Sequence, residues 1–407
     1  MLKTSLTNQN LNKHQEDLLA FSLGMMSGED GTELIEKYKE AIEKVTPFDM
    51  VMLEDTQFRM GIGVTEIKKT INKVINVFFK SLKSFQWESP KEGTFLYFLM
   101  LENRAFEFKL NKVKQILKSY KGTEELELRD LKKELLNHFI EFKQFESHYV
   151  KKENVLSPCI EKKRDDYRPL KVMWSLHDDI RKKINLLIGL LTSEKSTWQI
   201  INKEIGSYYF LVFGMIQKEE LVLYPIASKT FSEDELNDMH IQSFEYGFPF
   251  IETPVKPDIE MKEKQRSFNY NKGLIQTENS EITVEQALLL FNHLPVDITF
   301  VDENDTVKFF SNPKNRLFPR SPAIIGRKVQ NCHPPESVHV VEEIIKAFKN
   351  GDRDMAQFWL ELNNRFILIQ YFAVRNNENK YYGVLEVSQD VTEIKNLKGE
   401  RRLLEWE

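Results

Sequence analysis

Apolar residues recur every three or four positions along most of the first 240 residues, the spacing of one helix face. Four longer segments with such faces follow a set of shorter ones, at residues 95–120, 124–155, 171–191 and 197–227. Helices of this length with short connections predict an antiparallel four-helix bundle, whose interior can hold metal ligands. The pattern therefore predicts an all-α architecture for residues 1–245.

Residues 1–85 are predicted to form shorter helices before this bundle. The run Thr46-Pro47-Phe48-Asp49 is typical of a helix start, with a Thr cap, Pro in the first turn and an acid at the third position. The sequence thus indicates a small N-terminal helical domain at residues 1–85 and the bundle at residues 86–245.

The bundle region contains an internal echo. The stretch HYVKKENVLSP begins at His148, and MIQKEELVLYP begins at Met215. Both share K-x-x-V/L-L, place Glu153 and Glu220 at the same position, and finish in proline. Proline interrupts helical hydrogen bonding, so each copy is predicted to close a helix of one bundle in similar surroundings.

From residue 296 the period changes to that of β-strands. The runs VDITFV, VKFF, AQFWLEL, RFILIQYFAV and YYGVLEVSQDV are rich in β-branched and aromatic residues. A turn is predicted at residues 302–305, a helix at 338–348 that ends at Asn350-Gly351, and a capped helix start at Thr283. Two strands, a helix and three strands predict an α+β domain with an antiparallel sheet at residues 281–407, after a linker at 246–280.

Bulk composition excludes several function classes. The chain has 407 residues and a net charge of −5, so no basic field points to nucleic acid. Its two cysteines, Cys159 and Cys332, cannot build a disulfide framework and fit a reducing cytosol. The N-terminus lacks a signal-like apolar core, and the longest apolar run, residues 208–216, is too short to cross a bilayer. We therefore expect a cytoplasmic protein with no membrane and no nucleic-acid partner.

Histidine and carboxylate side chains in the predicted bundle suit non-haem iron, manganese or zinc. His138 and His148 would lie about 15 Å apart on one helix, so they cannot share an ion. His148 and Glu153 are turned about 140° from each other, so this pair needs a local bulge or a helix end. An ammonium or guanidinium group cannot ligate an ion, which excludes Lys152 and Arg181. The coherent candidate metal ligands are therefore His148, Glu153, His177, Glu219 and Glu220. The alternative is an ordinary solvated helix surface.

The run Asn331-Cys332-His333-Pro334-Pro335 is the unusual segment of the C-terminal domain. Two prolines fix the entry to the next helix and remove donors that would be left unpaired there. Three side chains are able to bind a haem iron, and they are the candidate cofactor-binding residues Cys332, His333 and His339. A rigid loop with a buried thiol is the alternative.

These segments resemble a family of bacterial proteins that join a small N-terminal helical domain of unknown function, a hemerythrin-like HHE cation-binding domain and a C-terminal PAS domain. The PAS resemblance covers about residues 283–406, through stretches such as LPVDITFVDENDTVKFFS, FPRSPAIIGRKVQNCHPPESVHVVEEI and GVLEVSQDVTEIKNLKGERRLLEW. HFIEFKQFESHYVKKENVLSP, VMWSLHDDIR and MIQKEELVLYP are similar to hemerythrin-like segments, and LEDTQFRMGIGVTEIKKTINKV to the N-terminal domain.

The resemblance places His148, Glu153 and His177 at metal-ligand positions, and Glu219 or Glu220 at the acid of the last helix. This chain departs from the pattern where the family carries further histidines, which are replaced here by Thr94, Tyr97, Met215 and Arg181. The resemblance implies non-haem iron in the bundle and haem or another small ligand in the PAS domain. PAS domains enclose such ligands between an antiparallel sheet and short helices, and ligand state biases signalling helices.

The favoured hypothesis is a cytoplasmic sensory protein, not an enzyme because no catalytic motif is evident. Its PAS domain would bind a small ligand or haem, and a degenerate hemerythrin-like site would sense iron, oxygen or nitric oxide. Output would pass to an unknown protein partner or through a homodimer formed by the PAS or helical regions. The alternatives are a non-haem di-metal protein with redox or gas-scavenging activity, and a scaffold whose sites are vestigial.

Overall fold

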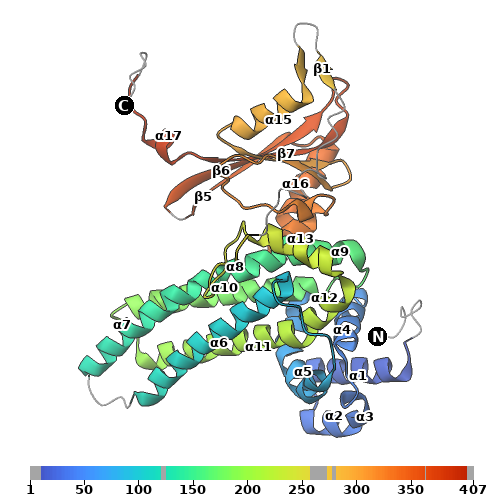
Figure 1. Cartoon of the computed structure of the whole chain (residues 1–407), viewed down its shortest axis with the longest axis vertical. Helices are drawn as coiled ribbons and strands as arrows, with labels where there is room; N and C mark the ends of the chain where they lie inside the picture. Colours follow the sequence, from blue (N-terminus) through green and yellow to red (C-terminus); the bar gives the residue numbers. More distant parts are fainter. Residues whose placement is uncertain (1–10, 121–124, 257–272, 277–280, 363, 401–407) are drawn as a thin grey trace. The chain divides into compact units, whose positions relative to one another are not determined.

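The computed structural model describes residues 11–120, 125–256, 273–276, 281–362 and 364–400, which divide into a helical unit and an α+β unit. The helical unit begins with five helices (Figure 1): α1 (Lys13–Ser27), α2 (Gly31–Lys37), α3 (Lys39–Ile42), α4 (Pro47–Arg59) and α5 (Val64–Ser84). Thr46 caps α4 as predicted: its hydroxyl accepts from the Asp49 amide, and the Asp49 carboxylate accepts from the Thr46 amide.

Longer helices then form the bundle: α6 (Phe95–Ser119), α7 (Glu125–Phe142), α8 (Glu146–Lys151), α9 (Ser157–Lys163), α10 (Leu170–Thr192), α11 (Trp198–Lys218) and α12 (Tyr224–Thr230), followed by α13 (Glu233–Ser243). Helices α6, α7, α10 and α11 run side by side (Figure 1), and α10 packs on both α7 and α11. The predicted all-α region is confirmed.

Two π-helical turns interrupt these long helices at equivalent places of the internal echo, Lys152–Leu156 and Glu219–Leu223. The first begins directly after Lys151 and contains Glu153. The prediction that proline ends each helix is wrong, because Pro158 and Pro225 lie in the first turns of α9 and α12. Each π-turn shifts the hydrogen-bond register directly before its proline, and the first turn of a helix tolerates a missing N–H.

One continuous hydrophobic core runs through the helical unit, from Leu18 on α1 to Met239 on α13. The segment that follows α13 also packs on it. Phe250 lies 5.5 Å from the Phe106 ring and 5.9 Å from the Phe145 ring, measured between centroids. The described part of the predicted linker is therefore partly packed, whereas residues 257–272 and 277–280 lie outside the described residues.

The α+β unit contains all five strands predicted from the β-rich runs: β3 (Asp297–Asp302), β4 (Val307–Phe310), β5 (Met355–Leu362), β6 (Arg365–Arg375) and β7 (Tyr381–Asp390). They form an antiparallel sheet in the order β4-β3-β7-β6-β5, which confirms the predicted α+β domain. Its helices are α15 (Val284–His293), α16 (Val338–Asn350) and α17 (Thr392–Asn396). A short hairpin of β1 (Leu274–Gln276) and β2 (Glu281–Thr283) was not predicted.

The inner face of this sheet packs against α16. Ile345 and Phe348 of α16 share a buried cluster with Val301 of β3 and Val384 of β7. The β3–β7 pair comes unusually close at Gly383, whose φ of 144° suits glycine and whose position leaves no room for a Cβ beside the Val301 carbonyl. Glu386 and Ser388 follow Val384 at alternate positions, so they project from the same inner face.

No helix among the described residues combines the length and the apolar character needed to span a bilayer.

Candidate functional site

The interior of the bundle contains a cluster of buried polar side chains at the level of the two π-turns. We call it the buried polar centre, and it consists of Glu102, Asn103, His148, Lys151, Lys152, Glu219 and Tyr224. His148 is fully buried between two carboxylates. Its Nδ1 lies 2.7 Å from Oε2 of Glu102, and its Nε2 lies 3.0 Å from Oε2 of Glu219.

Two buried lysines bind the remaining oxygens of these carboxylates. Lys151 donates to Oε1 of Glu102, and Lys152 donates to Oε1 of Glu219. Each ammonium also faces an aromatic ring: Nζ of Lys151 lies 4.5 Å from the centre of the Phe248 ring, and Nζ of Lys152 lies 4.9 Å from that of Tyr149. A buried cation is stabilised by both kinds of contact.

Further donors complete the surroundings of Glu219. Its Oε2 accepts a hydrogen bond of 2.9 Å from the Asn103 amide and one of 2.9 Å from the Tyr224 hydroxyl. Both oxygens of Glu219 are therefore engaged by side chains of this chain, as are both oxygens of Glu102.

A second cluster adjoins the centre around His177. Nδ1 of His177 donates to Oε1 of Glu153 at 2.7 Å, and Arg181 donates to both oxygens of Glu153 at 3.0 Å. Arg181 also binds Glu146 and Asp178, each at 2.8 Å. Nε2 of His177 is buried and has no hydrogen-bond partner in the part of the chain that the structure describes.

A third buried ion pair joins the bundle to the N-terminal helices. Nζ of Lys218 lies 2.6 and 2.7 Å from the two oxygens of Glu54 on α4, and both side chains are almost fully buried. In the internal echo Lys218 occupies the position of Lys151, and Glu219 occupies that of Lys152.

The protonation of the centre follows from its hydrogen bonds. A neutral imidazole has one N–H, but both ring nitrogens of His148 face carboxylate oxygens, so one additional proton must lie between His148 and a neighbouring carboxyl group. Burial raises the pKa of Glu102 to about 7, and it lowers the pKa of His148. The Glu102 carboxyl is thus the better place for that proton.

The structure brings the predicted metal ligands together in pairs rather than around one point. His148 contacts Glu219, and His177 contacts Glu153. Glu220 belongs to neither pair: it is half-buried near Glu107 and Arg104 of α6 and contacts Asn103 of the buried polar centre. Of the four positions where the family's histidines are replaced, Arg181 binds Glu153. The other three hold Thr94 at the N-cap position of α6, half-buried Tyr97, and buried Met215.

These residues do not fit a bound metal ion. Metal sites in proteins of this ligand chemistry use three or four converging ligands. Among the described residues, no three His, Cys, Asp or Glu side chains are grouped to hold an ion. Lysine side chains bind the oxygens of Glu102 and Glu219 instead. Among the described residues, both ring nitrogens of His148 and Nδ1 of His177 have partners, whereas Nε2 of His177 has none.

The PAS-like unit carries a separate polar cluster on the inner face of its sheet. Arg320 lies 3.7 Å from Oε1 of Glu386 on β7, and Tyr371 of β6 pairs directly with Glu386 across the ladder. Nε of Arg320 is buried without a partner among the described residues. Burial lowers the pKa of the nearby His333, where Glu386 opposes this effect and Arg320 adds to it.

The three predicted haem ligands lie in different surroundings. Cys332 is half-buried against the core of the sheet, and His333 is half-buried near Arg320 and Glu386. His339 lies on α16 and is exposed to solvent.

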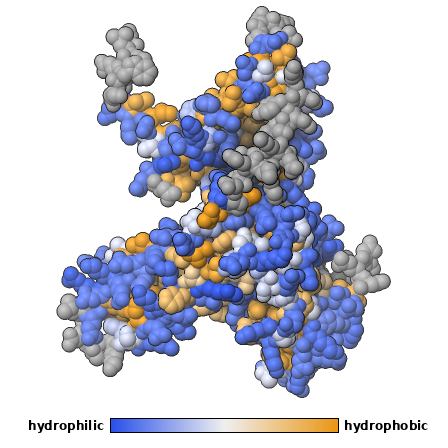
Figure 2. Space-filling view, viewed as in Figure 1, coloured by the Kyte–Doolittle hydropathy of each residue, from blue (hydrophilic) through white to orange (hydrophobic). Residues whose placement is uncertain are grey.

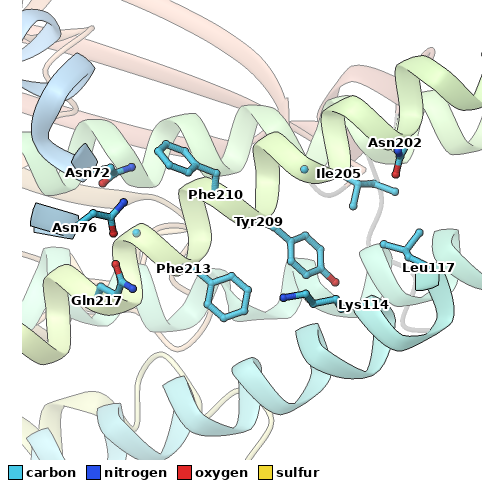
Figure 3. A pocket seen from close by; sticks show the side chains of 12 residues that line it. Asn72, Asn76, Lys114, Leu117, Asn202, Ile205, Tyr209, Phe210, Phe213 and Gln217 are labelled. Carbon is cyan, nitrogen blue, oxygen red and sulfur yellow. The ribbon is translucent and has the colours of Figure 1, made fainter. Parts of the chain in front are cut away.

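A groove with a volume of about 470 Å³ opens at the side of the bundle between α5, α6 and α11. Figure 3 shows aromatic side chains of α11, Tyr209, Phe210 and Phe213, opposite Lys114 of α6 and beside Asn72 of α5. None of the predicted site residues lines this groove.

The fold defines a protein that combines a helical bundle with an α+β domain built on an antiparallel five-stranded sheet. Residues 91–227 match the family of the hemerythrin HHE cation binding domain, and residues 288–392 match a PAS domain family. The chain therefore carries a hemerythrin HHE domain and a C-terminal PAS domain, preceded by a helical N-terminal region. The HHE match implies a metal site, and the two domains together suggest sensing or signalling. No curated protein matches the chain.

Three solved structures are similar to part of this chain. A C-terminal domain from Streptococcus mutans is 32% identical over 31% of this chain and 98% of its own, with a TM-score of 0.30. The PAS domain of a Colwellia psychrerythraea protein is 18% identical over 27% of this chain and 98% of its own, with a TM-score of 0.22. A sensory box sensor histidine kinase from Vibrio cholerae is 13% identical over 26% of this chain and 92% of its own, with a TM-score of 0.21.

Proposed function

We propose that this chain is a cytoplasmic sensory protein whose PAS domain binds a small organic anion at Arg320. The observation that carries this proposal is the Nε of Arg320 in the α+β unit, which is buried and has no partner among the residues that the structure describes. A buried guanidinium donor without an acceptor is costly, so such a donor marks the place of an acceptor from outside the chain.

The contact between Arg320 and Glu386 is too long to satisfy the guanidinium. Charge-assisted hydrogen bonds are about 2.7–2.9 Å long, whereas Arg320 and Glu386 are 3.7 Å apart. The guanidinium is therefore only loosely paired. A carboxylate or phosphate ligand would bind its free edge, and Tyr371 and His333 would supply further polar contacts.

Signal output requires a surface that changes its contacts. Figure 2 shows hydrophobic side chains over α15 and at β5, where Leu289, Leu290 and Trp359 are more than half exposed. Exposed apolar patches of this kind are typical of interaction surfaces. We propose that they bind a second copy of the chain or a protein partner, and that the protein is not an enzyme.

The HHE match supports a second candidate function, a metal site that senses iron, oxygen or nitric oxide, or one that gives the chain redox activity. Its ligands would be His148, Glu153, His177, Glu219 and Glu220. The free Nε2 of His177 favours this candidate, and the ammonium groups on Glu102 and Glu219 oppose it. A haem bound through Cys332 or His333 is the corresponding alternative in the PAS domain.

The test is the identification of small molecules that co-purify with the full chain, by mass spectrometry after denaturation. We expect an organic anion whose affinity falls about 10- to 100-fold in Arg320→Ala, as for loss of a hydrogen bond to a charged group. Arg353→Ala, at an exposed arginine of the same domain, is the matched control. An unchanged affinity in Arg320→Ala would refute the proposal, and a Soret band lost in His333→Ala would replace it with haem binding.

A further inference from the structure

We infer that the ammonium groups of Lys151 and Lys152 take the place of metal ions in the interior of the HHE bundle. The domain would then be assembled around cations that belong to the chain itself. This inference concerns the helical unit alone and is independent of the ligand proposed for the PAS domain.

The first argument is the position of the two ammonium groups. Each one binds a buried carboxylate, Lys151 that of Glu102 and Lys152 that of Glu219, and His148 bridges the same two carboxylates. Carboxylate and imidazole groups on facing helices are the ligands that hold metal ions in such bundles. The lysines thus bind the oxygens that an ion would need.

The second argument is the count of free ligand atoms. Both oxygens of Glu102 and both oxygens of Glu219 already accept hydrogen bonds, and both nitrogens of His148 face carboxylates. A divalent ion would have to displace these contacts and push aside the two lysine side chains that occupy the carboxylate oxygens.

The third argument is that the protein interior is shaped for ammonium groups. The faces of the Phe248 and Tyr149 rings lie 4.5 and 4.9 Å from Lys151 and Lys152. Phe145 stacks on His148 at 4.5 Å and fixes the imidazole that separates the two carboxylates. Aromatic faces attract organic cations, but they offer no ligand atom to a transition metal.

The internal echo repeats the arrangement. Lys218, the equivalent of Lys151, binds Glu54 through both carboxylate oxygens and is also almost fully buried. Lys152 and Glu219 occupy the same place in the two copies and bind each other. Three buried lysines therefore lie at positions of the echo, and each one binds a buried glutamate. The lysine–glutamate contact is thus a repeated feature of this bundle.

Removal of both ammonium groups should therefore create a metal site. In Lys151→Met/Lys152→Met the oxygens of Glu102 and Glu219 lose their cations, while His148 and the free Nε2 of His177 remain available. The control variant is Lys133→Met/Lys171→Met, which removes two exposed lysines from the same bundle. Each full-length protein is freed of metal with a chelator and titrated anaerobically with Co²⁺ and Zn²⁺.

We expect the natural chain and the control variant to bind no ion stoichiometrically, and the Lys151→Met/Lys152→Met variant to bind Co²⁺ at least about 100-fold more tightly, with visible d–d absorption bands. Zn²⁺ should raise the melting temperature of that variant alone. Tight, stoichiometric binding by the natural chain that His148→Ala abolishes would overturn the inference.

A folded Lys151→Met/Lys152→Met variant that binds neither ion would also overturn it. If this variant folds only in the presence of Zn²⁺, the inference is supported. If it does not fold under either condition, the same titration is made on Lys152→Gln, which keeps a donor for Glu219 and removes only the charge. Binding of Co²⁺ or Zn²⁺ by Lys152→Gln supports the inference, and a folded Lys152→Gln that binds neither ion overturns it.

Discussion

The buried pair of Glu54 and Lys218 allows a quantitative test of how the helical unit is held together. The substitution Lys218→Met keeps most of the side-chain volume and removes the ammonium, which leaves the Glu54 carboxylate without its cation. Both side chains are buried, at 0% and 2% exposure, so water cannot replace the lost contact. The pair joins α4 to the end of α11, and its loss should destabilise the contact between the N-terminal helices and the bundle.

The expected size of the effect follows from the cost of an unpaired buried charge. Breaking a buried ion pair on one side typically costs about 3–5 kcal/mol, whereas replacing both partners by apolar residues is neutral or stabilising by about 1–4 kcal/mol. We therefore expect Lys218→Met to destabilise the unit by about 3–5 kcal/mol, and Glu54→Met/Lys218→Met to recover all of this loss.

The way in which the destabilisation by Lys218→Met changes with pH provides an independent test. Burial raises the pKa of Glu54, and Lys218 opposes this effect, so removal of Lys218 lets the pKa rise further. An acid with a raised pKa in the folded state binds its proton there more tightly than in the unfolded state. The destabilisation in Lys218→Met should thus be small near pH 4.5 and grow as the pH rises.

Hydrogen exchange followed by mass spectrometry suits this test, because peptides of α4 and α11 report the local stability of the helical unit without contributions from the PAS domain. Lys13→Met, which removes a lysine on the surface of α1, is the control and should leave these peptides unchanged. Equal losses in the single and double variants, or a loss below about 1 kcal/mol in Lys218→Met, would refute the reasoning.

Two further predictions test the polar centre and the sheet. Because burial raises the pKa of Glu102 from 4.5 to about 7, the stability of the helical unit should fall by up to about 3 kcal/mol as the pH rises across this range. Urea denaturation at a series of pH values measures this dependence, and Glu102→Gln should abolish it. A free energy of unfolding of the natural chain that does not change with pH would contradict the raised pKa of Glu102. Gly383→Ala should destabilise the PAS domain by at least about 2 kcal/mol, because its Cβ meets the Val301 carbonyl. Exchange of β3 and β7 peptides measures this loss; Gly351→Asn, at an open left-handed position, should change little.

The fold was largely predictable because its signals are local. Each of the five strands of the PAS sheet is an apolar run of its own, and the capped helix start at Thr283 and the stop at Gly351 are set by one or two residues. The β1–β2 hairpin was missed because each strand has three residues, too short for an alternating pattern. The prediction that each proline ends a helix failed because a π-turn precedes each proline, so that the helical path continues. Such a π-turn depends on packing.

The site was predictable only in part. His148 and His177 were singled out, and both are buried in the bundle interior. Their partners were not, because Glu102 lies 46 residues from His148 along the chain, and Lys152 lies 67 residues from Glu219. Such pairings are set by the packing of distant helices. The echo carried one usable signal, because it places Lys151 and Lys218 at equivalent positions of its two copies.

The kind of cation inside the bundle, a metal ion or a lysine ammonium group, decides which chemical signals the bundle can sense. A metal ion dissociates, exchanges and changes its oxidation state, so a bundle built around one can report metal supply, oxygen or nitric oxide. An ammonium on a lysine side chain is covalently attached and has no redox chemistry. If Lys151 and Lys152 replace the ions, the bundle responds to none of these inputs, and the unpaired donor of Arg320 in the PAS domain becomes the place where a chemical signal is read. The two proposals then divide the chain into a fixed helical body and a ligand-dependent domain.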